Sequence, residues 1–366
     1  MLAFGRLQAL FLPALHSTDI LQPLDLIYIT IYDVSVPVKV RMSYVFVMFG
    51  QRESFRMGKT YAVAIGIACI DEYYHAESWI SEGAKGIVRF DHSQVGGMIP
   101  NAASVLAKLG TKTYLVTALN SGASANVIRE ALENRGLDLS FIITDETISD
   151  PKCMIVNTPK ERSILVVDSS DVHYPVSDSL RNLLYNATCI YTSMMEFHRI
   201  EGWEALASTL KQKGILLSFD CETSTFDNAD DILFRYAGIL FFNEEGWQKY
   251  KGGRTKEEAI QILLKYGVKA IVITLGSNGC YCRSATEEIR LRGHKVPVID
   301  PTGAGDTFNS SFISCLMKGT TLRYAAEFAN AAGAYAVTVK GTDHIAKPWD
   351  EMKKILYHTF RRNESL

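Results

Sequence analysis

Short apolar runs alternate with amphipathic helical stretches from residue 61 almost to the end of this 366-residue chain. Apolar runs without polar alternation predict strands buried on both faces, and helical stretches between them predict parallel crossovers. The expected strands are 61–67, 113–118, 188–192, 214–219, 238–242, 269–275 and 279–282. The expected helices are 99–109, 124–136, 201–213, 255–266, 306–318, 321–337 and 347–360. We therefore expect an α/β fold with helices on both faces of a mostly parallel sheet.

One segment interrupts this alternation. Residues 152–157 and 162–167 are apolar runs joined by Thr158-Pro159-Lys160-Glu161, a pattern that predicts a β-hairpin. Together with residues 72–95, this segment is expected to form a small sheet that projects from the main one. We expect no linker after residue 57, so residues 57–366 should be one large domain.

Residues 1–56 differ in character from the rest, because charged residues break up their apolar runs. No run reaches the ~18 uncharged apolar residues that span a bilayer, so no membrane partner is expected. Met57 stands shortly before the first clean strand and is interpreted as the natural start. Residues 1–56 are then an N-terminal extension of unclear status, and a weak targeting segment remains open.

The bulk composition argues against two further classes of partner and site. The net charge is −2 with no dense basic patch, so no nucleic-acid partner is expected. Seven cysteines are scattered without C-x-x-C pairs, which favours a reducing, cytoplasmic location. Cys280 and Cys282 form the one close pair in the sequence, and a metal or redox role for them is the less favoured interpretation.

An apolar run ends at Asp300, a glycine-rich corner follows, and a helical pattern begins near Asp306. Gly303 and Gly305 permit a tight turn whose free N–H groups, aided by the helix dipole, form a site for an anion such as phosphate. An aspartate repels anions, but Asp306 could accept a proton from a hydroxyl group. The alternative is that Asp306 is only the N-cap of the helix.

A second corner of this kind lies about two hundred residues earlier. Gly96-Gly97 precedes a helix with Pro100 in its first turn, and Asn101 should point its amide toward the glycines. The plainer alternative is a Gly-Gly turn before a helix. Two such corners on one α/β chain, one suited to an anion and one bearing an amide, together favour a phosphate-transfer site.

The two corners resemble the N-terminal and C-terminal signatures of the PfkB family of carbohydrate kinases, with ribokinases as the nearest members. Gly96-Gly97 with Asn101 carries the first signature, and Asp300–Asn309 carries the second. The resemblance covers residues 59–360. It implies a ribokinase-like αβα layered fold, in which a small β-sheet lid of residues 72–95 and 152–170 closes over the sugar.

The resemblance also implies roles for individual residues. Asp306 is expected to be the catalytic base, with the corner of Gly303, Ala304 and Gly305 as the anion hole. The expected sugar-binding residues are Asp71, Gly96, Gly97, Asn101, Glu196 and Asp306. The expected nucleotide-binding residues are Asn243, Thr274, Leu275, Gly276, Ser277, Asn278, Gly279, Gly305 and Asn330. The plainer alternatives are a turn cap for Asp71, a surface charge for Glu196 and a polar helix position for Asn330.

Two positions depart from the family pattern. Cys69 stands where ribokinases usually have asparagine, so the acceptor need not be ribose. The family motif N-x-x-E, whose glutamate orders magnesium through water, is here Asn243-Glu244-Glu245-Gly246. Either Glu244 or Glu245 could replace the missing carboxylate. Asp300 is a further candidate, as the partner of a monovalent cation.

The implied function is transfer of the γ-phosphoryl group of ATP to a primary hydroxyl of a small sugar, with ATP and Mg²⁺ as cofactors and K⁺ left open. The implied partners are sugar and ATP, with a homodimer through the lid as a further possibility. A nucleoside kinase of the same family and a non-catalytic sugar-binding homologue remain as alternatives. A dinucleotide-dependent dehydrogenase is disfavoured, since no G-x-G-x-x-G follows the first strand.

Overall fold

The computed structural model describes residues 29–30, 43–44, 60–167, 171–343 and 345–357. The chain divides into two units, Met1–Ser54 and Phe55–Leu366. In the first, β1 (Ile29–Thr30) and β2 (Ser43–Tyr44) form a short antiparallel pair. The other described elements belong to the second unit. Among the described residues, no helix combines the length and apolarity needed to cross a membrane.

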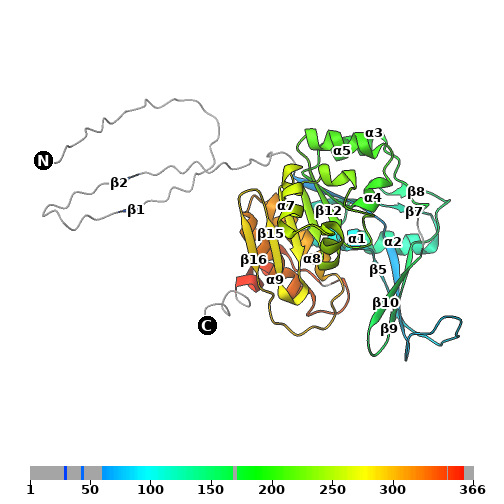
Figure 1. Ribbon diagram of the computed structural model, residues 1–366. Helices are drawn as coiled ribbons and strands as arrows, with labels where there is room; N and C mark the ends of the chain where they lie inside the picture. The colour runs from blue at the N-terminus through cyan, green and yellow to red at the C-terminus, as the bar shows by residue number, and fades with distance from the viewer. Residues whose placement is uncertain (1–28, 31–42, 45–59, 168–170, 344, 358–366) are drawn as a thin grey trace, which may run out of the picture. The chain divides into compact units, whose positions relative to one another are not determined.

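An eight-stranded sheet lies at the centre of the second unit, in the order β16-β15-β14-β13-β12-β11-β3-β6 (Figure 1). The strands from β14 to β6 pair in parallel, and β15 and β16 add an antiparallel edge. This confirms the expected mostly parallel sheet. The bounds are β3 (Tyr61–Ile65), β6 (Lys112–Val116), β11 (Cys189–Ser193), β12 (Leu216–Cys221), β13 (Ile239–Phe242), β14 (Ala270–Thr274), β15 (Cys280–Arg283) and β16 (Glu288–Leu291).

Both faces of this sheet are buried, because its strands alternate apolar side chains between two hydrophobic cores. In β14, Ala270 and Val272 enter one core, and Ile271 and Ile273 enter the other. The first core packs against α1 (Met98–Lys108), α2 (Ala123–Asn134), α8 (Ala304–Met317), α9 (Leu322–Ala336) and α10 (Trp349–Ile355). The second packs against α3 (Asp178–Tyr185), α4 (Met194–His198), α5 (Trp203–Gln212), α6 (Glu244–Lys251) and α7 (Lys256–Lys265). The αβα layering is therefore confirmed.

A separate four-stranded sheet has the order β10-β9-β4-β5 and extends away from the main sheet (Figure 1). Its strands are β4 (Cys69–His75), β5 (Arg89–Gly96), β9 (Lys152–Asn157) and β10 (Arg162–Val166). The predicted hairpin is confirmed, since β9 and β10 pair antiparallel. The unexpected pair is β4 with β9, which run parallel. We call these four strands the small sheet.

Several apolar side chains of the small sheet face solvent. Phe90 on β5 is 56% exposed, and Ile164, Leu165 and Val166 on β10 are between 46% and 70% exposed. Apolar side chains left in water favour association, which gives a physical reason for the predicted homodimer through this sheet. The dimer itself stays a prediction, which the mass of the protein in solution would test.

Several elements were missed from the sequence, and three of them have a clear physical reason. The strand β16 alternates charged and apolar residues and has only Ile289 fully buried, so its apolar run is too short to detect. The helix α6 contains Gly246, which lowers helix propensity. The helix α3 spans only eight residues, with a Ser177 N-cap whose hydroxyl accepts the Leu180 N–H.

We expect a fragment of residues 57–366 to fold without residues 1–56, because the second unit contains both hydrophobic cores. Its thermal unfolding should be cooperative, with a Tm within about 2–4 °C of the full-length chain, the shift that roughly 1 kcal/mol produces in a domain of this size. Circular dichroism melting of both proteins measures this. An insoluble fragment, or one that melts without cooperativity, would contradict the proposed domain boundary.

Candidate active site

The glycine corner begins α8 as a helix capped by glycine. Gly303 is the N-cap with φ of 78°, a left-handed conformation that favours glycine, and the helix starts at Ala304. A Cβ atom at Gly303 would also lie 2.8 Å from Ile345 Cδ1. Asp306 therefore lies inside the first turn and is not the N-cap, so that simpler interpretation is wrong. Around Gly305 there is open space, which leaves this first turn accessible to a ligand.

The carboxylate of Asp306 lies among other acidic groups at the carboxyl end of the sheet. Burial raises its pKa well above the ordinary value, the charges of Asp220 and Glu222 raise it further, and a hydrogen bond from the Asn101 side chain opposes the shift. A carboxylate with a raised pKa holds a proton more strongly, as a general base requires. The two glycine corners therefore meet, through Asn101 and Asp306.

Asp220 is the last residue but one of the buried strand β12, and its charge acts on Asp306. Its Oδ2 accepts hydrogen bonds from Tyr191 Oη at 2.7 Å and from Asn309 Nδ2 at 2.8 Å. Burial raises the pKa of Asp220 to about 7, and the neighbouring Glu222 contributes in the same direction. The sequence analysis did not include Asp220, although its place at the end of an apolar run was a usable signal.

The other corner is shaped by close backbone contacts. Gly97 has φ of 105° and caps α1, and a Cβ atom there would lie 2.4 Å from the Ile67 carbonyl oxygen. Asn101 is 5% exposed, and its Oδ1 meets no hydrogen-bond donor among the described residues. The helices of the two corners pack together, since Ser310 Oγ donates to the Ala102 carbonyl at 2.7 Å. Asn101 thus offers a free, buried acceptor beside Asp306.

Asp71 lies within β4 and is 7% exposed, so its interpretation as a turn cap is wrong. A Cβ atom at Gly96 would stand 2.0 Å from Asp71 Oδ2, and the glycine is therefore needed to make room for this carboxylate. Burial raises the pKa of Asp71, and hydrogen bonds from Cys69 and Cys153 oppose the shift. Its charge also acts on Asp306.

Glu196 is 4% exposed in α4, so its interpretation as a surface charge is wrong. It accepts hydrogen bonds from Tyr174 Oη at 2.5 Å and Arg199 Nη1 at 3.2 Å. Burial raises its pKa, while Arg199, Tyr174 and the Ile67 backbone oppose the shift. Glu196 therefore links the backbone of Ile67, whose carbonyl oxygen lies close to Gly97, to residues of the second core.

The expected nucleotide-binding loop follows β14 and contains the short 3₁₀ helix η2 (Gly276–Asn278). Its residues Gly276, Ser277 and Asn278 are exposed. Gly279 is needed for packing, because a Cβ atom there would lie 2.1 Å from the Leu291 carbonyl oxygen. Thr274 Oγ1 donates to the Phe242 carbonyl at 3.3 Å, which ties the loop to the neighbouring strand. Among the described residues, no hydrogen bond or ion pair joins this loop to Asp306.

Two asparagines of the expected nucleotide site have structural partners. Asn330 Nδ2 donates to the Arg292 carbonyl at 2.8 Å and so fastens the segment that Gly279 also contacts. Asn243 is the N-cap of α6, and its Oδ1 accepts the Gly246 N–H at 2.7 Å. These bonds leave the Asn330 carbonyl oxygen and the Asn243 amide hydrogens as the groups that could reach a ligand.

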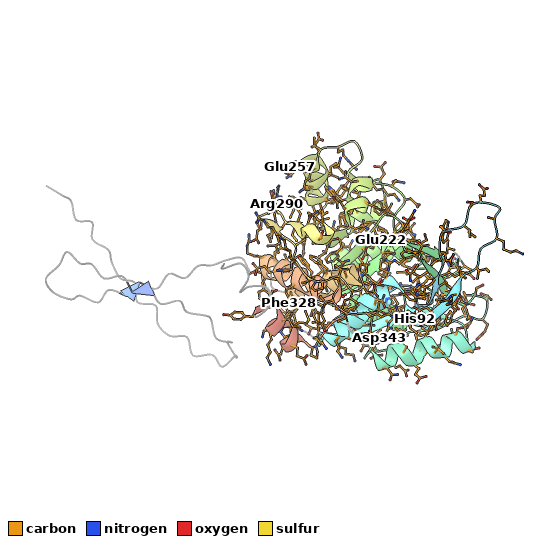
Figure 2. All side chains as sticks on the ribbon, turned by 90° about the horizontal axis from the view of Figure 1, so that it is seen from below. His92, Glu222, Glu257, Arg290, Phe328 and Asp343 are labelled. Carbon is orange, nitrogen blue, oxygen red and sulfur yellow. The ribbon has the colours of Figure 1, made fainter. Side chains whose placement is uncertain are left out.

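The missing glutamate of the N-x-x-E motif has a steric explanation. A Cβ atom at Gly246 would lie 2.0 Å from the Cys221 carbonyl oxygen, so no side chain fits at this position without backbone movement. Glu244 and Glu245 are exposed, and Glu245 accepts a hydrogen bond from Thr223 Oγ1 at 3.4 Å. Glu222, labelled in Figure 2, is the residue after β12, and its charge acts on both Asp220 and Asp306. The sequence analysis missed it.

Asp300 holds two backbone segments together. Its Oδ1 accepts the Thr302 N–H at 2.9 Å and its Oδ2 accepts the Gly341 N–H at 3.0 Å. Burial favours the neutral form, but these hydrogen bonds outweigh it and hold the pKa of Asp300 below its ordinary value. The carboxylate is thus charged and could attract a cation.

Arg162 connects the small sheet to the glycine corner. Its Nη1 donates to Thr302 Oγ1 at 2.6 Å, and its charge acts on both Asp71 and Asp300. The sequence analysis placed Arg162 in the hairpin without a role. Only the pairing of the small sheet brings this guanidinium next to residues 140 positions away.

The comparisons with known proteins agree with this geometry. Residues 59–349 match the family model described as pfkB family carbohydrate kinase. The chain is 24% identical to a ribokinase of Haemophilus influenzae, over 72% of this chain and 87% of the relative. It is also 24% identical to a nucleoside kinase of Methanothermobacter thermautotrophicus, over 76% and 90%.

A solved structure has the same fold. The Arabidopsis thaliana ribokinase complexed with ribose and ATP superimposes with a TM-score of 0.72, at 24% identity, over 82% of this chain and 99% of that one. The match of the family model extends over most of the chain and includes both glycine corners. This chain belongs to the pfkB family of carbohydrate kinases.

Proposed function

We propose that this protein transfers the γ-phosphoryl group of ATP to a primary hydroxyl group of a small sugar. The observation that carries the proposal is the placement of Asp306. Its carboxylate lies in the first turn of α8, bonded to Asn101, beside the open space at Gly305. A base next to a helix N-terminus brings together the two parts that phosphoryl transfer to an alcohol requires.

In the proposed mechanism, Asp306 accepts the proton of the sugar hydroxyl as its oxygen attacks the γ-phosphorus in line. The N–H groups of the Gly303–Asp306 turn stabilise the negative charge on the transferring group, because the helix N-terminus carries a partial positive charge. Catalysis by this site then rests on position and electrostatics. Arg162, bonded to Thr302, would add a further positive charge at the corner.

The sugar is proposed to lie between the small sheet and Asp306. Asp71 supplies a buried carboxylate for sugar hydroxyls, and Asn101 supplies its unpaired Oδ1. Gly96 and Gly97 allow the backbone to approach closely, and Glu196 supports that backbone through Ile67. The small sheet, as a lid, would exclude water from the reaction.

ATP is proposed to bind along the exposed loop Thr274–Gly279, with Asn243 and Asn330 as further contacts. Mg²⁺ neutralises charge on the transferring phosphoryl group when it is bound. The donors near Asp306 fit this ion, because carboxylate oxygens are its usual protein ligands. Glu222 is the best-placed carboxylate, with Glu244 and Glu245 as the earlier alternatives; Asp300 as the partner of K⁺ stays a prediction.

Each of the seven cysteines is a free thiol, which supports the proposed cytoplasmic location, where thiols stay reduced. A nucleoside kinase remains the second candidate, because one relative carries that name. A non-catalytic sugar-binding protein is less favoured, since the base and the nearby carboxylates are in place.

A substrate panel tests the proposed function. Ribose, fructose, deoxy-sugar acids and nucleosides are incubated with ATP and Mg²⁺, and ADP release is measured. A small sugar should give the highest kcat/KM, because the described polar groups suit hydroxyls. Turnover confined to nucleosides would transfer the proposal to the second candidate, and sugar binding without ADP release would favour the non-catalytic alternative.

Replacement of the base by its isostere, Asp306→Asn, should lower kcat by roughly 10²–10⁴-fold with little change in KM, because binding does not need the proton acceptor. Steady-state kinetics measure both constants. The variant should melt no earlier than the wild type, because one of several neighbouring carboxylates is removed. Near-normal turnover in a folded variant would exclude Asp306 as the base.

The pH profile should show the raised pKa of Asp306. The base must be unprotonated, so kcat/KM should fall as the pH drops through this pKa, and the fall should begin well above the ordinary value of 3.8. In Asp220→Asn, the acid limb should move to lower pH, because one neighbouring negative charge is removed. Glu257→Gln, on the distant helix α7, is the control and should leave the limb unmoved. An acid limb that stays in place in Asp220→Asn would refute the electrostatic coupling.

A further inference from the structure

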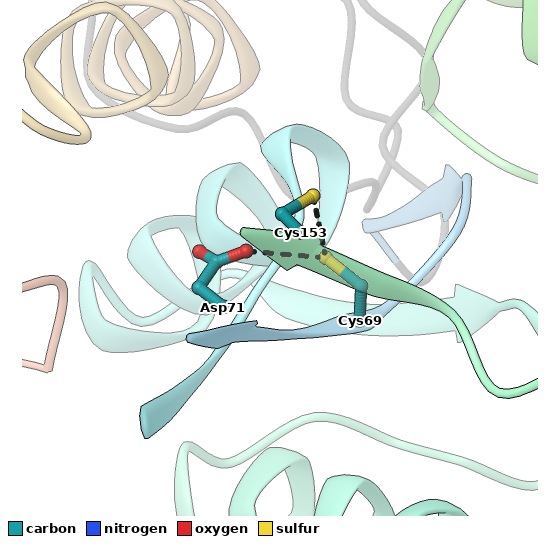
Figure 3. Close-up of side chains that lie close together, drawn as sticks. All are labelled: Cys69, Asp71 and Cys153. Carbon is teal, nitrogen blue, oxygen red and sulfur yellow. Dashed lines mark hydrogen bonds between the residues drawn. The ribbon is translucent and has the colours of Figure 1, made fainter. Parts of the chain in front are cut away.

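Three potential metal ligands meet on one face of the small sheet. Cys69 and Asp71 are two residues apart on β4, so their side chains point to the same side. On the neighbouring strand, Cys153 stands directly opposite Asp71 in the parallel register. Figure 3 shows the three side chains converging, and Gly96, opposite Cys69, leaves space for the Asp71 carboxylate.

Two of the three distances between the ligand atoms match those around a tetrahedral ion, and the third lies within 4.8 Å. Cys69 Sγ lies 3.8 Å from Cys153 Sγ and 3.4 Å from Asp71 Oδ1, and all three atoms lie within 4.8 Å of one another. A tetrahedral Zn²⁺ with Zn–S bonds of about 2.3 Å and a Zn–O bond of about 2.0 Å separates two sulfurs by about 3.8 Å and sulfur from oxygen by about 3.5 Å. The cluster therefore needs little rearrangement to hold such an ion.

The same register disfavours a disulfide. Cys153 is paired with Asp71, and Cys69 lies two residues before Asp71 on β4. With strands about 4.8 Å apart and a rise of about 3.3 Å per residue, the Cα atoms of Cys69 and Cys153 are about 8 Å apart. Disulfides need Cα atoms within about 7 Å. A metal ion, which lies between the sulfurs, does not have this restriction.

A cation bound at the cluster would have to displace the thiol protons. The hydrogen bond with Cys153 and burial raise the pKa of the Cys69 thiol, and the negative charge of Asp71 adds to the shift. A bound dication would reverse these effects and release the thiol protons. The positive charges of Arg135 and Arg162 act on Asp71, where they favour its ionised form while opposing a further cation.

We propose that Cys69, Asp71 and Cys153 form a binding site for a thiophilic divalent cation of the Zn²⁺ class. Three protein ligands leave a fourth position for water, as in open zinc sites. The proposed function adds a consequence that rests on it: an ion that engages Asp71 removes a sugar-binding carboxylate. The cation should therefore inhibit the kinase in competition with the sugar.

The binding test uses Co²⁺, which replaces Zn²⁺ and gives visible and near-ultraviolet absorption in a tetrahedral thiolate site. Titration of the reduced, metal-free full-length protein should produce these bands with one ion per chain. Cys69→Ser and Cys153→Ser should each abolish the thiolate bands while keeping the far-ultraviolet circular dichroism of the wild type. Cys282→Ser, which removes one member of the Cys280/Cys282 pair, is the matched control and should keep them.

Several outcomes would overturn the site: no thiolate bands in the wild type, bands that persist in folded Cys69→Ser, or bands lost in Cys282→Ser.

Competition is measured separately, as the apparent inhibition constant of Zn²⁺ at several sugar concentrations. This constant should rise with the sugar concentration in the wild type. At a given sugar concentration it should be more than about tenfold higher in Cys153→Ser than in the wild type, which is the scale on which metal sites respond to altered ligation. Co²⁺ bands together with inhibition that ignores sugar would retain the metal site and remove Asp71 from sugar binding. Sugar turnover without Co²⁺ bands would overturn the metal site and leave the proposed function intact.

Discussion

A parallel sheet buried on both faces leaves little room for charged side chains except near its strand ends. In this protein the apolar residues of β14 and its neighbours fill two cores, and Asp220 appears only at the end of β12. The carboxyl ends of parallel strands lie at one edge, so carboxylates that follow different strands are forced close together. Burial at these strand ends raises the pKa values of Asp220 and Asp306, and the neighbouring carboxylates raise them further.

Close backbone packing builds the remainder of the site. Gly97 lets the start of α1 approach the Ile67 carbonyl, and Gly96 makes room for Asp71. Gly246 has the same kind of role at the start of α6, where the Cys221 carbonyl fills the space of a side chain. A glycine in a functional motif can therefore reflect a steric requirement of the fold. The glutamate that the family motif predicts at this position is absent, and we propose Glu222 in its place.

The small sheet contributes more than a cover. Through Arg162 it contacts the glycine corner, and through Asp71 it places a charge near the base. Its parallel pair, β4 with β9, brings Cys153 opposite Asp71 although the residues are far apart in the chain. The same strands thus carry the proposed sugar contact and the proposed cation site, which couples the two through a shared carboxylate.

The sequence by itself determined the fold class, the hairpin and both glycine corners. Each of these depends on local properties, namely apolar periodicity and the backbone freedom of glycine. Family resemblance then directed attention to Asp71, Asn101 and Asp306, which the structure brings into one region. The helix start at Ala304 was also local, and the prediction missed it by two residues because a glycine N-cap carries no side-chain signal.

Only the tertiary structure decided which charges meet. Asp220 and Glu222 lie at the end of β12 and Arg162 begins β10, and their proximity to the corner depends on strand order and register. These are set by burial of the whole core, a property that no short window of sequence contains. The approach of Cys69 to Cys153 has the same origin, because pairing of β4 with β9 joins two stretches that share no local pattern.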